Sequence, residues 1–261
     1  MKIALAQMDI LWCNKEENKK KCTEFFKKAQ TVKADLILFP EMTLTGFCMD
    51  IQCVAEEDSE TLTWFKEQAK YFNLNIGFGY VKKEDNKGLN IFSVISSDGT
   101  VLSKYTKLHP FSFASETDYY NSGDEIVFTK IKEFLTSTFI CYDLRFPEVF
   151  QIASTKSELI TIIANWPKVR RDHWITLLKA RAIENQCYVA AVNRVGTGNE
   201  IEYVGDSMII DPQGNILATS YNNEELIVAD IDLEEVHKLR SSFKVKDDRR
   251  NDFYSSLLHG I

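Results

Sequence analysis

Three residues of the sequence combine the chemistry of a nucleophile, a base and a cation, and each follows a short apolar run. Cys141 comes directly after the β-prone segment 134–140, Glu41 after 36–39, and Lys107 after the run that ends at 105. A thiol needs a base or a positive neighbourhood to act as a nucleophile near neutral pH. Glu41 has the chemistry of that base, and Lys107 that of a cation stabilising an oxyanion. Together these residue types predict a cysteine-dependent amide hydrolase.

Each of the three residues also has a simpler interpretation when it is taken alone. A cysteine in a strand is most often a buried, inert apolar residue. A glutamate after Phe-Pro is most often a turn residue, and a lysine in a loop is usually solvated. Two other classes of protein therefore stay open: a binding protein without activity and a redox sensor that uses its thiol.

The elements that must position these residues alternate between strand and helix along the chain. The patterns predict strands at 2–8, 35–39, 74–80, 90–95, 134–140, 159–164, 186–193 and 204–210, and helices at 15–30, 147–153 and 171–186. A further helix is expected to end at Phe72 and to begin with Asp58 or Ser59 as its cap. Alternation of this kind indicates an α/β fold, and residues 1–261 show no linker that would divide them into domains. An α-β-β-α sandwich of two packed mixed sheets and a doubly wound single sheet both fit the pattern.

Composition excludes several classes of function. With 44% hydrophobic and 26% charged residues, the chain has the composition of a globular protein, and its net charge of −7 argues against nucleic acid as a partner. The N-terminus has the pattern of a strand rather than of a signal peptide, and no apolar segment is long enough to span a membrane. We therefore expect a cytoplasmic protein whose six scattered cysteines are free thiols. No four ligands show the spacing of a zinc site, so we expect neither metal nor cofactor.

Longer segments around the three residues resemble a known family. Residues 38–46, 104–109 and 141–148 are similar, in order and separation, to the signature segments of the nitrilase superfamily of carbon–nitrogen hydrolases, and the similarity continues to 248–254. The resemblance implies an α-β-β-α sandwich that pairs into a homodimer, with Glu41 as general base, Lys107 as oxyanion cation and Cys141 as nucleophile. It also implies a second glutamate beyond the lysine, which Glu116 matches best and Glu125 less well.

The residues near the cysteine indicate a branch of this superfamily. Tyr142-Asp143 is typical of its amidase-like branches, whereas nitrilases usually have Trp-Glu at these positions. Together with 164–167, 173–174 and 193–196, this segment resembles bacterial omega-amidases, which hydrolyse the terminal amide of 2-oxoglutaramate and 2-oxosuccinamate. Deaminated-glutathione amidases share the segment 141–148 and are the second possibility. Carbamoylases and nitrilases are the third.

A small amide that carries a carboxylate needs a cation in its pocket. Arg145 is the cation closest in sequence to the nucleophile, although it could instead form a structural ion pair with Glu148. Lys168, Arg170 and Arg171 are further candidates. The sequence alone does not choose between them.

The short carbon chain of such a substrate also needs apolar walls. Trp166 and Phe111 are candidates for these walls, and Trp166 suits the hydrophobic core equally well. The backbone N–H of Tyr142 is expected to join Lys107 in binding the oxyanion.

Overall fold

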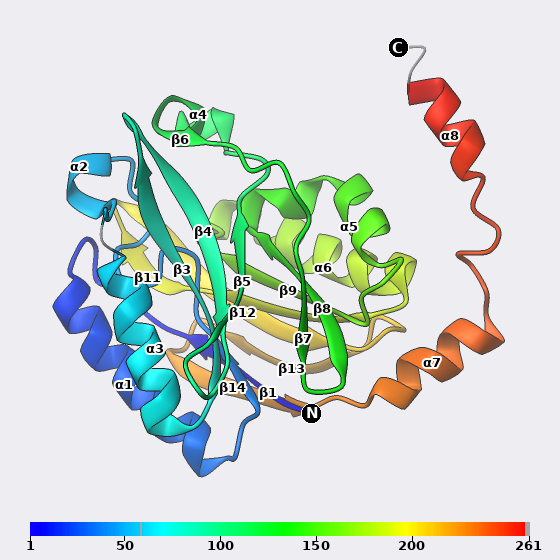
Figure 1. Cartoon of the computed structure of the whole chain (residues 1–261), viewed down its shortest axis with the longest axis horizontal. Coiled ribbons are helices and arrows are strands. Elements are labelled where there is room, and N and C mark those ends of the chain that lie inside the picture. The colour runs from blue at the N-terminus through cyan, green and yellow to red at the C-terminus, as the bar shows by residue number, and fades with distance from the viewer. Residues whose placement is uncertain (58, 259–261) are drawn as a thin grey trace.

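The computed structural model describes residues 1–57 and 59–258, and this part of the chain forms two seven-stranded sheets (Figure 1). The first sheet has the order β14-β1-β2-β3-β4-β5, with β6 paired to β4, and the second has the order β11-β12-β10-β9-β8-β7, with β13 paired to β12. The strands of the first are β1 (Lys2–Gln7), β2 (Leu36–Leu38), β3 (Asn75–Glu84), β4 (Lys87–Ile95), β5 (Val101–Thr106), β6 (Tyr120–Asn121) and β14 (Glu225–Asp230). Those of the second are β7 (Phe128–Ile131), β8 (Phe134–Ile140), β9 (Leu159–Ala164), β10 (Tyr188–Asn193), β11 (Val195–Gly198), β12 (Ile201–Ile210) and β13 (Ile216–Tyr221).

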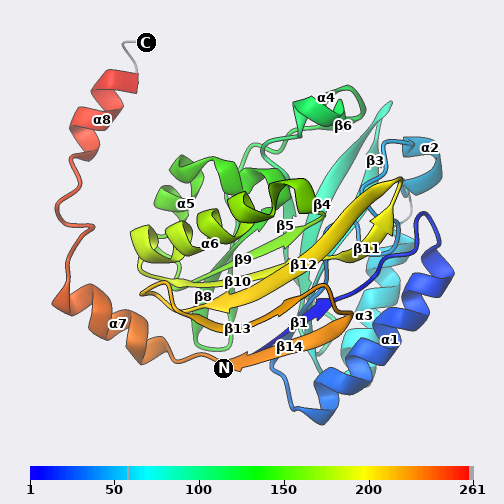
Figure 2. The same cartoon turned by 180° about the vertical axis from the view of Figure 1, so that it is seen from behind.

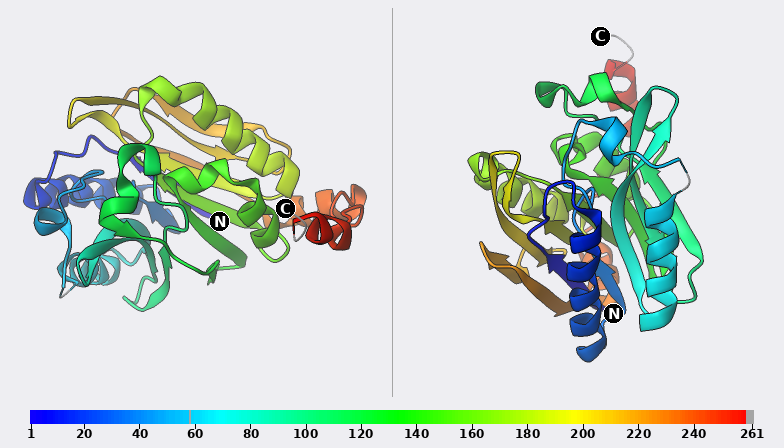
Figure 3. Two further views of the ribbon diagram at one scale, coloured as in Figure 1. Left: turned by 90° about the horizontal axis from the view of Figure 1, so that it is seen from above. Right: turned by 90° about the vertical axis from the view of Figure 1, so that its left-hand side faces the viewer.

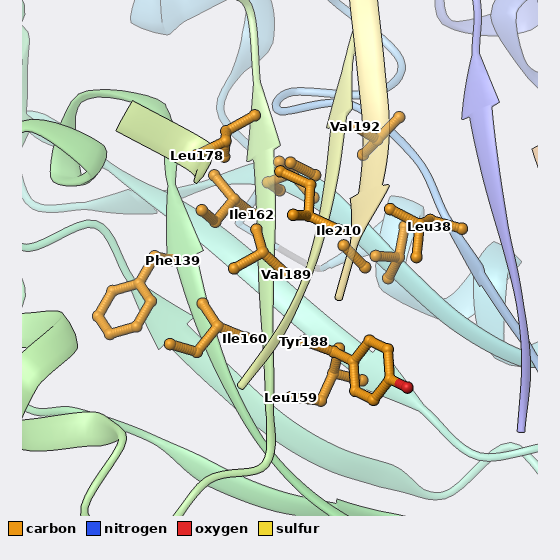
Figure 4. Packing of buried hydrophobic residues seen from close by; sticks show 14 of the residues in the cluster. Leu38, Phe139, Leu159, Ile160, Ile162, Leu178, Tyr188, Val189, Val192 and Ile210 are labelled. Carbon is orange, nitrogen blue, oxygen red and sulfur yellow. The ribbon is translucent and has the colours of Figure 1, made fainter. Parts of the chain in front are cut away.

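The two sheets pack face to face, and helices cover their outer faces (Figures 1 and 2). α1 (Lys15–Thr31) and α3 (Glu60–Phe72) pack on the first sheet, and α5 (Pro147–Ala153) and α6 (Arg171–Asn185) on the second. The close-up in Figure 4 labels Leu38 of the first sheet in one cluster with Ile162, Val189 and Ile210 of the second. This arrangement is the α-β-β-α sandwich, and it decides against the doubly wound single sheet.

Burial on both faces explains why the central strands of the second sheet have continuously apolar sequences. Every residue of β9 and of β10 is buried, and β8, β9 and β10 run parallel to one another. Parallel strands covered on both faces have no solvent side and therefore show no polar alternation. The same kind of apolar run, at 134–140, was the basis for predicting that Cys141 follows a buried strand.

The first turn of α3 differs from the expectation. The helix begins at Glu60, but Ser59 has a φ of 56° and its side chain makes no capping hydrogen bond, so this cap assignment was wrong. The Glu56 carboxylate instead accepts the Thr61 N–H at 2.8 Å. Asp58, the alternative cap, lies outside the described residues.

Two C-terminal helices that the sequence patterns did not predict follow the last strand. α7 (Leu233–Ser242) leads away from the sheets, and α8 (Asn251–Leu258) stands apart from the body (Figures 1 and 3). The remaining helices are short: α2 (Ile51–Val54), α4 (Glu116–Tyr119) and the 3-10 turns Ser112–Ala114, Cys141–Arg145 and Lys168–Arg170. Within the described ranges, no helix has both the length and the apolar character needed to cross a membrane.

Candidate active site

The candidate residues meet at one edge of the sandwich because the strands that precede them end there. β2 and β5 run in the same direction in the first sheet, and β8 and β9 are parallel in the second. The chain leaves these strands at Glu41, Lys107, Cys141 and Asn165. The carboxyl ends of strands are where α/β proteins commonly place their sites.

A buried lysine joins two buried carboxylates. Lys107 Nζ lies 3.1 Å from Oε1 of Glu41 and 2.8 Å from Oε2 of Glu116, and the three side chains are at most 1% exposed. The structure therefore brings the expected second glutamate, Glu116, into this group. Glu125, the weaker match, lies exposed on the surface.

Two asparagines that the sequence analysis did not assign complete the environment of Glu41. Asn90 Nδ2 donates to Oε1 of Glu41 at 2.8 Å and to Oε1 of Glu116 at 3.2 Å. The backbone N–H of Asn165 donates to Oε2 of Glu41 at 2.9 Å, and its Nδ2 donates to the Glu41 carbonyl at 2.7 Å. Asn165 was recognisable, since it follows an all-apolar strand just as Glu41 and Cys141 do. Asn90 lies inside β4 rather than at its end, so the sequence pattern does not single it out.

Backbone strain accompanies the catalytic candidates. Cys141 has a φ of 45°, Met42 next to Glu41 a φ of 46°, and Ser115 next to Glu116 a φ of 58°. A side chain in this region costs about 1–3 kcal/mol, and such residues cluster at functional sites where the surrounding fold holds them. Cys141 begins the 3-10 turn that follows β8, and it lines the same cavity as Lys107.

The fully buried carboxylate of Asp143 holds the Cys141 turn in place. Its Oδ2 accepts the Tyr105 hydroxyl at 2.7 Å and the Ile140 N–H at 3.0 Å. Its Oδ1 accepts the His109 N–H at 3.0 Å and lies 2.8 Å from His109 Nδ1. Asp143 thus ties the Cys141 turn of one sheet to the lysine segment of the other. The sequence analysis used this residue only to choose a branch of the superfamily.

The charges of the group shift its pKa values in defined directions. Burial raises the pKa of the Cys141 thiol well above its usual value, and the Glu41 charge adds to this effect while Lys107 opposes it. Burial would lower the pKa of Lys107, but the charges of Glu116 and then Glu41 outweigh it and hold that pKa above its usual range. Burial also raises the pKa of Glu116. These directions favour the protonated forms of both the Cys141 thiol and the Lys107 amine.

A cavity of about 500 Å³ opens over Cys141 and Lys107. The predicted walls Phe111 and Trp166 line it, and so does Tyr142, whose backbone N–H was expected to bind the oxyanion. Phe111 and Tyr142 pack ring against ring with centroids 4.7 Å apart. Trp166 is only 3% exposed and belongs to the hydrophobic core as well as to the cavity wall, so both interpretations of this residue hold.

The four candidate cations have different partners. Arg171 binds both carboxylate oxygens of Asp206, at 2.7 and 2.8 Å, and Lys168 binds Glu202 at 2.8 Å. Arg145 forms no ion pair with Glu148 or another carboxylate of the described chain. Its guanidinium lies 4.8 Å from the Trp166 ring centre and 3.2 Å from His173 Nδ1. Arg170 lies with its guanidinium 5.2 Å from the centre of the Phe111 ring.

Comparison with known proteins agrees with this geometry. The chain belongs to the carbon–nitrogen hydrolase family, whose model matches residues 2–241. It is 38% identical over 256 residues to a 2-oxoglutaramate amidase of Bacillus subtilis, covering 97% of this chain and 98% of the relative. It is 33% identical over 251 residues to the omega-amidase YafV of Escherichia coli, covering 95% and 96%.

Solved structures show the same fold. A CN-hydrolase superfamily protein of Xanthomonas campestris, solved with an arsenic adduct in its active site, superposes with a TM-score of 0.89 at 29% identity, over 95% of this chain and 97% of that one. A carbon-nitrogen hydrolase from Helicobacter pylori superposes with a TM-score of 0.93 at 22% identity, over 99% and 98%.

Proposed function

We propose that this protein is an omega-amidase, which hydrolyses the terminal amide of small 2-oxo acid amides to the acid and ammonia. The observation that carries the proposal is that Cys141 lines a cavity together with Lys107, which is held between the buried carboxylates of Glu41 and Glu116. Full-length similarity to a 2-oxoglutaramate amidase supports the substrate. The first substrate to test is therefore 2-oxoglutaramate, with 2-oxosuccinamate as its shorter analogue.

The first half of the cycle forms a thioester. Glu41 takes the thiol proton as Cys141 Sγ attacks the amide carbonyl carbon, because a thiol with a raised pKa needs a base at the moment of attack. The negative oxygen is bound by the backbone N–H of Tyr142 and by Lys107, whose ammonium has three donors and two carboxylate neighbours. Glu41 then passes its proton to the leaving nitrogen, the C–N bond breaks, and ammonia departs.

The second half of the cycle releases the acid. Water enters the position that ammonia has left, and Glu41 removes a proton from it as its oxygen attacks the thioester carbonyl. The C–S bond breaks, the carboxylic acid leaves, and the Cys141 sulfur regains a proton from Glu41. Glu116 acts through Lys107, since it keeps the ammonium charged and in place throughout both halves.

The cavity walls suit a short, flat substrate. Phe111, Tyr142 and Trp166 supply apolar surface on the sides of the carbon chain, and Arg145 adds positive charge beside Trp166. We propose these four residues as substrate-binding residues. A 2-oxo acid amide presents an anion at the end remote from the scissile bond, which a positively charged wall attracts.

Ammonia release separates this activity from its alternatives. We expect fast release from 2-oxoglutaramate by the wild-type protein, and none above background from Cys141→Ala that folds with an unchanged melting temperature. Deaminated glutathione and a simple nitrile are run in parallel. Faster turnover of either would replace the omega-amidase assignment by the corresponding branch of the family.

We also propose that residues 1–261 form one hydrolase domain that acts as a homodimer in the cytoplasm. The two sheets share a single core, which supports one folding unit. Apolar side chains exposed on the outer helices support pairing of two copies, among them Ile152 at 58% and Ile183 at 52%. All six cysteines are free thiols, as proteins of a reducing compartment keep them. Light scattering at a known protein concentration tests the dimer.

A further inference from the structure

Three of the six cysteines gather at one place and have no part in the proposed catalytic cycle. Cys13, Cys48 and Cys53 are free thiols in the structure. Cys48 is buried, Cys13 is half-buried and Cys53 is exposed. Thiols that lie close together can be joined by oxidation, provided that the fold holds the segments that carry them side by side.

Hydrogen bonds hold the segment of Cys13 against the segment that leads to Cys48. The Cys13 N–H donates to the Thr45 carbonyl at 2.9 Å. Asn18, on α1 just after Cys13, donates from Nδ2 to the Leu44 carbonyl at 2.8 Å. Cys13 itself packs against the apolar cluster that contains Cys48. The proximity of these two thiols therefore follows from the fold of the backbone.

Cys53 reaches the same place from α2. The Asp50 N–H donates to Cys48 Sγ at 3.4 Å, and the Asp50 carbonyl accepts the Cys53 N–H at 3.0 Å, so one residue holds the turn between the two cysteines. Burial raises the pKa of the Cys13 thiol, and hydrogen bonding and charge from Cys48 and from Cys53 raise it further. Charges act in this way over about 4–6 Å, so Cys13 lies within a few ångströms of both other thiols.

The three thiols differ in how easily a dissolved reagent reaches them. Thiol–disulfide exchange begins when a thiolate attacks a disulfide in solution, so the attacking sulfur must be accessible. Cys53 is exposed and meets this condition, whereas Cys48 is buried. Once Cys53 carries a mixed disulfide, its negative charge no longer raises the pKa of Cys13, and Cys13 more easily becomes the second attacking thiolate.

We propose that Cys13 and Cys53 are a redox-reactive pair, which small-molecule disulfides convert to an intramolecular disulfide separate from the catalytic thiol Cys141. The Cys53 thiolate attacks one sulfur of the small disulfide, the S–S bond of that molecule breaks, and one small thiolate leaves. Cys13 then gives its proton to solvent and its sulfur attacks Cys53 Sγ, so the mixed S–S bond breaks and the second small thiolate leaves. Two protein thiols are thereby oxidised, and one small disulfide is reduced to two thiols.

Peptide mapping after treatment with oxidised glutathione tests this proposal. The full-length protein is incubated with the reagent, quenched in acid, and digested with trypsin and a protease that cleaves before aspartate. Asp50 stands between Cys48 and Cys53, so this digest separates the two cysteines. We expect a peptide pair joined through Cys13 and Cys53, lighter by two hydrogen atoms than the sum of its parts, and its disappearance after dithiothreitol. The pair should form equally in Cys141→Ala, where the number of free thiols should fall by two.

Single serine variants distinguish the members of the cluster. Cys13→Ser and Cys53→Ser should each reduce the yield of the joined peptides to background, whereas Cys48→Ser, which removes the buried neighbour, should keep it. The rate of bond formation should not depend on protein concentration, because both thiols belong to one chain. A mixed disulfide that persists on Cys53 of the wild type, a bond that uses Cys48 or Cys141 in place of this pair, or a bond between two chains would overturn the proposal.

Discussion

Replacing Asp143 by asparagine tests how the turn that begins at Cys141 is held. The two carboxylate oxygens accept three donors between 2.7 and 3.0 Å, and Oδ1 also lies 2.8 Å from His109 Nδ1. An amide of the same size turns its NH₂ group toward at least one of these donors whichever way it is flipped: toward the His109 N–H in one orientation, and toward the Tyr105 O–H and the Ile140 N–H in the other. Each buried donor left without an acceptor costs about 1–3 kcal/mol, so Asp143→Asn in its better orientation should lower the free energy of unfolding by about 1–3 kcal/mol.

The unfolding free energy is measured by urea titration at low temperature, with two comparison variants. Tyr105→Phe removes one O–H donor and leaves the carboxylate, and should cost about 2 kcal/mol. Glu148→Gln changes an exposed carboxylate nearby and should stay within about 0.5 kcal/mol of the wild type. In folded Asp143→Asn we expect kcat to fall at least about tenfold, because the Cys141 turn loses its anchor. An Asp143→Asn variant with the stability and the turnover of the wild type would show that Asp143 does not hold the Cys141 turn.

Three further predictions concern the buried group around Glu41. A Cβ at Gly79 would stand 2.9 Å from the Glu41 Cα, so Gly79→Ala should displace the base and lower kcat by about 100-fold, measured at saturating substrate. Asn90→Leu removes the amide shared by Glu41 and Glu116 and should lower the free energy of unfolding by about 3 kcal/mol in urea. Because burial and the Glu41 charge raise the pKa of Cys141, the rate of its alkylation by iodoacetamide should still increase with pH at about pH 9. Glu41→Gln removes one of these charges, so the alkylation rate should begin to increase at a lower pH, and turnover should be abolished.

Controls for these three predictions come from the same elements. Ser93→Ala, on the strand that carries Asn90, should change the free energy of unfolding by less than about 1 kcal/mol. The exposed thiol of Cys53 is an internal reference for alkylation in the same digest. Full activity in Gly79→Ala, an Asn90→Leu variant as stable as Ser93→Ala, or an alkylation rate of Cys141 that is flat from neutral pH upward would each contradict the corresponding prediction.

Sequence reasoning found the parts of the site that stand at element boundaries. Glu41, Lys107 and Cys141 each end an apolar run, and an abrupt change from apolar to chemically active residues is visible in one dimension. Glu116 needed the family resemblance, since no strand points to it. The sandwich also needed that resemblance, because alternation of strands and helices does not distinguish one sheet from two.

What the sequence did not reveal depends on contacts between distant segments. The roles of Asn90 and Asp143 come from hydrogen-bond partners in distant segments of the chain. Asn90 and its partner Glu41, for example, are 49 positions apart. The partners of the candidate cations were likewise hidden in the sequence. Glu202 and Asp206, both on β12, pair with Lys168 and Arg171. The cap of α3 failed for the same reason, because Glu56 occupies the role expected of a residue next to the helix.

The proposed mechanism requires a covalent intermediate on Cys141, which mass spectrometry can detect. Wild-type protein is mixed with excess 2-oxoglutaramate, quenched in acid within the steady state, digested and analysed by mass spectrometry. We expect a thioester on the peptide that carries Cys141, with the mass of the acid less one water, and no such adduct in Cys141→Ala. Turnover by the wild type without any adduct, together with turnover retained in Cys141→Ala, would contradict it.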